Sequence, residues 1–488
     1  MSTQPPVSHL PRIVQTAWCL YRPVSLMRVF KRRYGDVCSM RMLDLGLMTL
    51  VQRPEHLREV FQADSSVLTA GEFNGRLLEP LLGTQSTSTS DGDEHLVNRR
   101  VLLGALGSER VARLRGQARE SAERSIDELR AGTTIRFYDF AKRSALRMII
   151  DAIFGFKDPK RSDRAIELVN AIDAGVLYGP PAFASIVPST RVFFRRRIAR
   201  FERSKADLDD FLYAEIDARR AAENDDTGEQ PTAILDLLIA ARYEDGSPLA
   251  RTKLRDELVL LLIAGHESSA TTLAWAVELL GRHPEVLEKV RAETLRGDSK
   301  EYLDAVIKET LRMRPVLPVV VRVVQKPFSV GGFDLPVGST VAASTWNMQN
   351  EEEFHERAHE FLPDRFIGDR PESFTWLPFG NGVRRCVGDR VAMMQIRELM
   401  IVLLGRVEFE TVARRPAKVR RRAVQYLPHH GTPVAIRNVS RRALEADQRC
   451  DTGHDADGAG LETGERAPGY TVQSLREDPA RRAGLGSG

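Results

Sequence analysis

The feature that most constrains this chain is the ten-residue stretch FGNGVRRCVG, which runs from Phe379 to Gly388. Three glycines surround a single cysteine, Cys386, and glycine adopts backbone conformations that the interior of a helix or strand does not favour. A thiolate binds a metal well only where its negative charge is stabilised. Backbone N–H groups of a glycine-rich turn supply that stabilisation, and so does the positive end of a helix, which we expect from about residue 387 to 404. The stretch therefore predicts a loop that presents Cys386 to iron, rather than a structural cysteine buried in a turn.

The spacing within this stretch follows the pattern F-x-x-G-x-R-x-C-x-G, with Phe379, Gly382, Arg384, Cys386 and Gly388 at its fixed positions. At this point the sequence resembles the cytochrome P-450 superfamily of haem-thiolate monooxygenases, in its soluble bacterial type. The resemblance implies that Cys386 is the axial ligand of the haem iron, that Phe379 packs near the sulfur, and that Arg384 pairs with a haem propionate. A thiolate ligand donates electron density to iron and favours cleavage of the O–O bond.

Composition excludes several classes of protein. The chain has 488 residues, of which 42% are hydrophobic, enough to bury a large core. Its 71 basic and 67 acidic residues leave a formal charge of +4, too small to indicate nucleic-acid binding. The basic clusters at 195–197 and 420–422 are interpreted as solvated faces. Four cysteines form no disulfide framework, which favours a reducing, cytoplasmic compartment.

The N-terminal region contains no segment that predicts a membrane anchor or a cleavable signal. Its longest apolar run, nine residues from Ile13 to Tyr21, is well short of the roughly 20 residues needed to span a bilayer. A short amphipathic segment that touches a membrane surface is a minor alternative here.

We expect one mainly α-helical domain with a small β-rich lobe, the cytochrome P-450 fold, over residues 1–436. Strands are predicted near 37–42 and 47–52, and helical periodicity dominates from 109 to 157. Residues 437–488 are rich in Gly, Ala, Asp, Glu and Arg and poor in large apolar residues, which predicts a disordered tail.

A long helix is predicted from the Ser247-Pro248 pair to Gly281, and its middle reads LLIAGHESSATT. Gly265 costs roughly 1 kcal/mol of helix stability, which indicates a purpose beyond packing. The resemblance implies that Glu267 is the acid and Ser268 the alcohol that deliver protons to oxygen bound nearby. The family more often has threonine at the second position, so a looser hydroxyl is expected here.

Three further residues are implied to bind the haem propionates. His95 and Arg99 are four residues apart and project from one face of a predicted helix. The resemblance assigns both of them, and Arg322, to contacts with the propionates. Without the resemblance, a His/Arg pair of this spacing would usually be interpreted as two surface residues with no binding role.

The stretch KETLRMRP places Glu309 and Arg312 three residues apart, and FLPDRF later supplies Arg365. In the family, E-x-x-R and this later arginine form a buried ion network that braces the cysteine loop. One departure is the segment NMQNEEEFHERAHEF, where the family usually has His followed by Arg-Asp-Pro and further prolines. The turn geometry of that segment is therefore left open.

Several apolar segments are implied to enclose a hydrophobic substrate. Residues 69–90 are interpreted as an irregular roof over the substrate cavity, or alternatively as local packing, and 175–188 as part of a mobile lid. Together with 316–320 they indicate a fatty acid, terpenoid, steroid or macrocycle about equally.

The implied cofactor is haem b, and the implied reaction inserts one oxygen atom from O2 into the substrate. No G-x-G-x-x-G motif lies between a strand and a helix, so NAD(P)H is expected to act only through a separate ferredoxin or flavodoxin with its reductase. We expect a monomer. Two alternatives are a peroxide-using or hydroperoxide-rearranging haem-thiolate enzyme and a non-catalytic haem-binding sensor.

Overall fold

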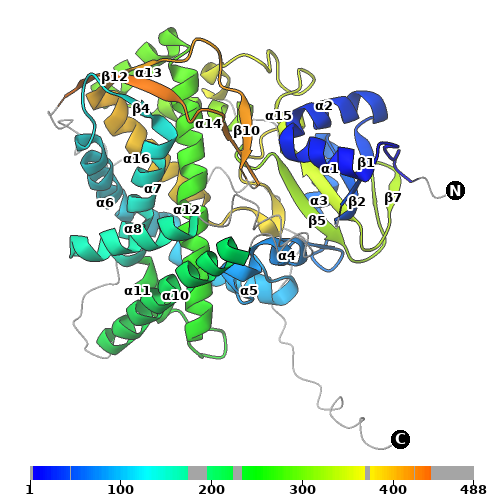
Figure 1. Cartoon of the computed structure of the whole chain (residues 1–488), viewed down its shortest axis with the longest axis horizontal. Helices are drawn as coiled ribbons and strands as arrows, with labels where there is room; N and C mark the ends of the chain where they lie inside the picture. The colour runs from blue at the N-terminus through cyan, green and yellow to red at the C-terminus, as the bar shows by residue number, and fades with distance from the viewer. Residues whose placement is uncertain are drawn as a thin grey trace, which may run out of the picture. The chain divides into compact units, whose positions relative to one another are not determined.

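The computed structural model describes residues 4–43, 45–173, 195–223, 233–368, 374–422 and 424–440 (Figure 1). The chain divides into two compact units, residues 1–446 and 447–488, and all described residues belong to the first. The predicted lid at 175–188, the acidic segment 224–232, and the tail beyond Ser440 lie outside the described residues.

A five-stranded sheet forms the small lobe, in the order β1-β2-β8-β5-β3. All neighbouring strands are antiparallel except β2 and β8, which are parallel. The sheet therefore joins the start of the chain to a segment near residue 340, as Figure 1 shows. Its strands are β1 (Val37–Met42), β2 (Gly46–Val51), β3 (Leu68–Thr69), β5 (Val319–Val324) and β8 (Thr340–Ser344), and the helices of this lobe are α1 (Arg12–Tyr21), α2 (Pro23–Tyr34) and α3 (Pro54–Gln62).

The rest of the described chain is mostly helical, as expected for the fold class. The central helix α12 packs along α7 and contacts α16, and its side chains are buried over most of its 30 residues (Figure 1). The helices are α4 (Gly71–Leu82), α5 (Gly92–Ala105), α6 (Ser108–Asp127), α7 (Phe137–Phe154), α8 (Pro159–Asp173), α10 (Arg195–Glu223), α11 (Ile234–Ala240), α12 (Arg251–Leu280), α13 (Pro284–Arg296), α14 (Glu301–Met313) and α16 (Asp389–Arg406).

Shorter elements connect these helices. A three-stranded sheet has the order β4-β12-β9, and two hairpins stand apart from it. The elements are β4 (Thr134–Arg136), β6 (Phe328–Val330), β7 (Phe333–Leu335), α15 (Thr345–Gln349), η2 (Pro363–Phe366), η3 (Gly382–Arg384), β9 (Val407–Thr411), β10 (Val419–Arg422), β11 (Gln425–Pro428) and β12 (Pro433–Val439).

The prediction of an irregular segment at 69–90 is wrong for α4, which is helical despite Gly75 and Pro80. The carboxylate of Asp91 accepts hydrogen bonds from three backbone N–H groups at the start of α4, those of residues 70, 71 and 72, at 2.8 to 3.0 Å. These are donors that a helix cannot satisfy internally. A tertiary contact and burial of Leu81 and Leu82 thus outweigh weak local propensity.

Two other boundaries differ from expectation. The helix α12 begins at Arg251, because Ser247 instead hydrogen-bonds Asp245 in a preceding turn, with its N–H 2.9 Å from Oδ1. The strand β12 continues to Val439, past the expected domain boundary at residue 436. Among the described helices, α12 alone is long and apolar enough to cross a bilayer, and 72% of its apolar window is buried inside the protein.

Candidate functional site

The loop that carries Cys386 is folded around backbone hydrogen bonds. The Cys386 N–H donates to the Phe379 carbonyl at 2.9 Å, and the Gly380 N–H donates to the carbonyl of Leu377 at 3.2 Å. Gly382 has a φ of +66° and lies so close to α3 that a Cβ there would be 2.2 Å from the carbonyl oxygen of Phe61. Glycine is therefore required at this position both by conformation and by space.

Cys386 is an exposed residue of this loop, and Phe379 is partly buried against the core beside it. The surrounding protein desolvates the sulfur and raises the pKa of the thiol, while a hydrogen bond from the Gly388 N–H lowers it. Gly388 also precedes α16, so the positive end of that helix lies next to the sulfur. These are the features that favour a thiolate once a cation is bound to it.

The helix α5 holds the cysteine loop from the side. The ring of His95 has Nδ1 2.9 Å from the Thr87 carbonyl and Nε2 3.2 Å from the carbonyl of Val383, and burial lowers its pKa. Arg99 donates to the carbonyl oxygen of Arg385, one residue before the cysteine. Both side chains therefore reach the loop that carries Cys386.

Arg384 turns toward the start of α5. Its guanidinium forms an ion pair with Asp91, the same carboxylate that binds the start of α4, and donates to the carbonyl of Ser90. Asp91 thereby links the two segments 70–72 and 384. Sequence reasoning missed this residue, although its position before a helix in DGDEH is a typical capping signal.

Arg322 is 7% exposed and projects from β5. Its guanidinium donates to the Val321 carbonyl at 2.9 Å and lies 5.9 Å from the ring centre of Phe61. Burial, and then the charge of Arg384, lower its pKa to about 10. Within the described part of the chain it has no ion pair with a carboxylate, so this region gathers more positive than negative charge.

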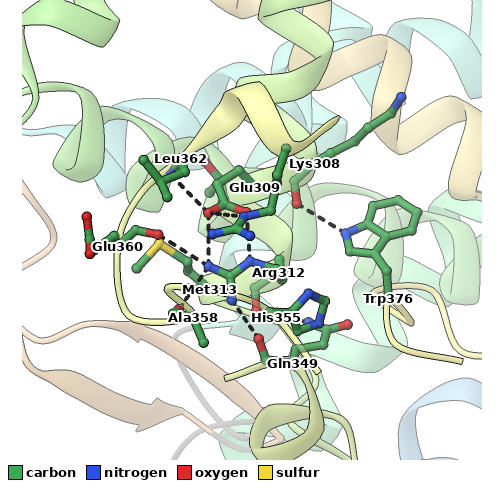
Figure 2. Close-up of polar contacts among 12 residues, drawn as sticks. Lys308, Glu309, Arg312, Met313, Gln349, His355, Ala358, Glu360, Leu362 and Trp376 are labelled. Carbon is green, nitrogen blue, oxygen red and sulfur yellow. Dashed lines mark hydrogen bonds and ion pairs between the residues drawn. The ribbon is translucent and has the colours of Figure 1, made fainter. Parts of the chain in front are cut away.

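The structure brings together Glu309, Arg312 and Arg365. Figure 2 shows the first two of these side chains in contact. Arg312 binds the Glu309 carboxylate through two nitrogens, at 2.7 and 2.9 Å, and both side chains are fully buried. Arg365 is 3.2 Å from the same carboxylate, and the Leu362 N–H donates to it at 3.0 Å. The carboxylate thus has four donors.

This network reaches the cysteine loop through a residue that the sequence did not reveal, Gln349. Arg312 donates to the Gln349 carbonyl at 2.7 Å, and the Gln349 side chain accepts from the N–H of Leu377 at 2.7 Å. Trp376 adds a hydrogen bond to the Lys308 carbonyl at 3.2 Å (Figure 2). The segment that enters the loop is therefore fixed to α14 just before Phe379.

Glu267 is also buried, at 1% exposure, but has different partners. Its Oε1 is 3.3 Å from the Lys142 ammonium and 3.6 Å from the Arg422 guanidinium. Burial raises the pKa of Glu267 and lowers that of Lys142, so both shifts favour the uncharged forms. The solvated-face interpretation does not hold for Arg422, which also donates to the Tyr138 hydroxyl at 2.9 Å.

Ser268, the next residue, is half-buried, and its hydroxyl donates to the Ala264 carbonyl at 2.9 Å. Gly265 has a packing reason that the sequence did not show: a Cβ there would be 2.9 Å from the Ile149 side chain on α7. His266 is fully buried, with Nδ1 2.7 Å from the Leu262 carbonyl, as expected for a structural residue. The helix is unbroken through this region.

An exposed cysteine thus lies just before the start of α16, a helix that packs against the long helix α12 with its buried acid. The sequence matches the family model described as Cytochrome P450 over residues 5–427. The chain belongs to the cytochrome P450 family and is a monooxygenase, an oxidoreductase whose cofactor is haem.

Individual relatives agree with this assignment. The chain is 33% identical to cytochrome P450 137 of Mycobacterium tuberculosis over 413 residues, which cover 83% of this chain and 84% of the relative. It is 33% identical to cytochrome P450 135B1 of Mycobacterium bovis over 438 residues, with 89% and 91% covered. The solved structure of a retinoic acid bound cyanobacterial CYP120A1 has the same fold, with a TM-score of 0.77 at 20% identity, covering 90% of this chain and 100% of that one.

Proposed function

We propose that this enzyme binds haem b through Cys386 and inserts one oxygen atom from O2 into a hydrophobic small molecule. The observation that carries the proposal is the exposed residue Cys386, with the Gly388 N–H directed at its sulfur and α16 beginning just behind it. When bound, the haem would supply the activation of oxygen, which a thiolate ligand favours.

The positive side chains around the loop suit a ligand with two carboxylates. Arg99, Arg322 and Arg384 carry three positive charges, and Asp91 is a carboxylate that pairs directly with Arg384. Buried charges without partners are costly, so an anionic ligand here would stabilise the fold. We assign the haem propionates to these arginines, with His95 nearby.

Glu267 and Ser268 are proposed to supply protons to the oxygen-binding side of the site. The raised pKa of Glu267 keeps a proton available on a buried carboxyl group. Its two partners are partly exposed, at 15% for Lys142 and 26% for Arg422, so they connect this carboxyl group to solvent. Ser268 would orient the last donor before oxygen.

The Glu309, Arg312 and Arg365 network is proposed to hold the cysteine loop in its ligand-binding shape. Its path to the loop runs through Gln349 and Leu377. Each connection is a hydrogen bond from a fully or nearly fully buried group, which makes the geometry costly to change.

The substrate class rests on apolar residues near the site. Phe73, Leu77 and Leu78 on α4 are only half-buried, as are Val319 and Val320 on β5. Such side chains favour a fatty acid, terpenoid, steroid or macrocycle. We further propose that a ferredoxin or flavodoxin with its reductase delivers electrons from NAD(P)H, and that the enzyme acts as a cytoplasmic monomer.

The axial ligand is tested by the absorption of the reduced, CO-treated protein. Cys386→Ala should abolish the band of thiolate-ligated haem, while Cys19→Ala and Cys38→Ala should keep it. If Cys386→Ala keeps a normal band and one of the other variants loses it, the assignment is wrong. Product formation with NADPH and surrogate redox partners, compared with peroxide alone, separates the monooxygenase from a peroxide-using enzyme or a sensor.

A further inference from the structure

The helix α1 has the reverse of the usual burial pattern of a surface helix, because it buries polar side chains and exposes apolar ones. Gln15 is fully buried and Thr16 is 9% exposed, whereas Ile13 is 69% exposed and Tyr21 is 83% exposed. A surface helix normally buries its apolar stripe and exposes its polar face. At about 100° per residue, Ile13, Val14 and Tyr21 share one arc of α1, opposite the two buried polar side chains.

The inward polar side chains have a structural reason. The strand β1 is at the edge of its sheet, where Val7 forms a bridge with Ser39 but no named strand pairs with the backbone groups farther along. Gln15 accepts a hydrogen bond from the Arg41 N–H at 3.0 Å, and Thr16 accepts one from the Leu43 N–H at 3.0 Å. The fold therefore explains why these two residues point inward, but it gives no reason for apolar residues to point outward.

Exposed apolar residues are concentrated in this part of the chain. Of the thirteen large hydrophobic residues exposed in the described chain, five lie within positions 10 to 29. Single exposed apolar side chains are normal, but a cluster marks an interaction site. We call this cluster the α1 surface; it consists of Leu10, Ile13, Val14, Tyr21 and Val29.

The charged residues of the segment that carries the α1 surface are of one sign. Residues 1–35 contain six Lys and Arg residues and no Asp or Glu. Five of the six are exposed arginines, and no carboxylate of the described chain forms an ion pair with any of them; they are Arg12, Arg22, Arg28, Arg32 and Arg33. A complementary partner must therefore be apolar and negatively charged.

We propose that the α1 surface docks on the surface of an anionic lipid bilayer. A membrane offers apolar chains beneath a layer of negative headgroups, and arginine side chains can bury their stems while the guanidinium stays at headgroup level. Tyr21 and the half-buried Trp18 are aromatic residues with one polar end, of the kind that is enriched at this boundary. Because α1 has only 10 residues, it lies on the membrane and does not span it.

The test is cosedimentation of the full-length, haem-loaded enzyme with lipid vesicles. We expect binding to phosphatidylcholine vesicles that contain phosphatidylglycerol, little binding to phosphatidylcholine alone, and weaker binding in high salt. The double variant Ile13→Ser/Val14→Ser should bind about tenfold less, and Arg12→Gln/Arg22→Gln should show a similar loss. The matched control is Val337→Ser, an apolar residue of 58% exposure outside the α1 surface, which should bind like wild type.

Thermal unfolding and the CO spectrum of each variant check that the fold is intact. The proposal is overturned if wild type does not bind anionic vesicles, or if Val337→Ser loses as much binding as the α1 variants. It is also overturned if sedimentation velocity shows a dimer that the Ile13→Ser/Val14→Ser variant cannot form. Unchanged vesicle binding in that variant, with slower reduction by a ferredoxin, would assign the α1 surface to a protein partner instead.

Discussion

Glu309 and Glu267 are both buried carboxylates on helices, but their surroundings differ in kind. Glu309 accepts four hydrogen bonds, at 2.7 to 3.2 Å, from two arginines and a backbone N–H. Glu267 has two ion pairs, at 3.3 and 3.6 Å, and both contacts are longer than any of the four hydrogen bonds of Glu309. Full hydrogen bonding stabilises a buried carboxylate, whereas incomplete bonding favours a bound proton.

From this comparison we infer that the fold keeps two acids for separate purposes. Glu309 and Arg312 are both closed to solvent, and their bonds lead toward the cysteine loop. Glu267 is paired with two partly exposed basic side chains, Lys142 and Arg422, so its surroundings reach the solvent boundary. The first carboxylate is therefore suited to hold a shape and the second to move a proton.

The largest effect is expected for Glu309→Ala. It leaves Arg312 buried with an uncompensated charge, which typically costs about 3 to 5 kcal/mol of unfolding free energy. Urea unfolding and the haem content per chain measure the result, and we expect most haem to be lost. Glu360→Gln, which alters an exposed ion pair in the segment that covers Arg312, is the matched control and should stay haem-loaded. A stable, fully loaded Glu309→Ala would refute the structural role.

A second effect concerns pH, because each network contains a buried histidine. Burial lowers the pKa of His266, next to Glu267, to about 3, and that of His355, near Arg312, to about 4. The unfolded chain binds these protons from about pH 6.5 downward and the folded chain does not, so the stability present above that pH is lost on acidification.

From pH 7 to pH 5 we expect a loss of about 2 kcal/mol for each of these two histidines. Urea unfolding at both pH values measures it. His266→Gln and His355→Gln should each lose less stability than wild type over the same interval. An identical loss in wild type and both variants would show that other groups cause the acid sensitivity.

The sequence predicted the fold class because its signals are local: the cysteine loop, the E-x-x-R pair and the helical periodicity each occupy a short stretch. It did not predict α4, whose start is bound by Asp91 from beyond the helix. Gln349 was also not predicted, because it belongs to no motif. Its role depends on long-range contacts with Arg312 and Leu377.

The sequence also did not predict the long-range partners of Glu267. Lys142 and Arg422 come from α7 and β10, far from α12 in sequence, and a basic residue by itself most often indicates a solvated face. The need for glycine at position 265 also became clear only from the approach of Ile149. Tertiary packing decides such contacts, and periodicity carries no information about them.

The smallest effect is expected at Ser268, beside Glu267. Ser268→Ala removes a hydroxyl that now donates to the Ala264 carbonyl, but water can partly replace it. We expect product per NADPH to fall roughly two- to fivefold, with more hydrogen peroxide released and an unchanged CO spectrum. Ser268→Thr should keep or improve the yield, because its methyl group restricts χ1. An unchanged yield in Ser268→Ala would remove the proposed role of this hydroxyl.

The most direct test of the contrast between the two carboxylates is product formation by Glu267→Gln, with haem content measured on the same sample. Glutamine keeps the size of the side chain but cannot supply the acidic proton. We predict wild-type haem content and a normal CO band, with the rate of product formation lowered about 100-fold. An unchanged rate would contradict the account, and so would a loss of haem like that expected for Glu309→Ala.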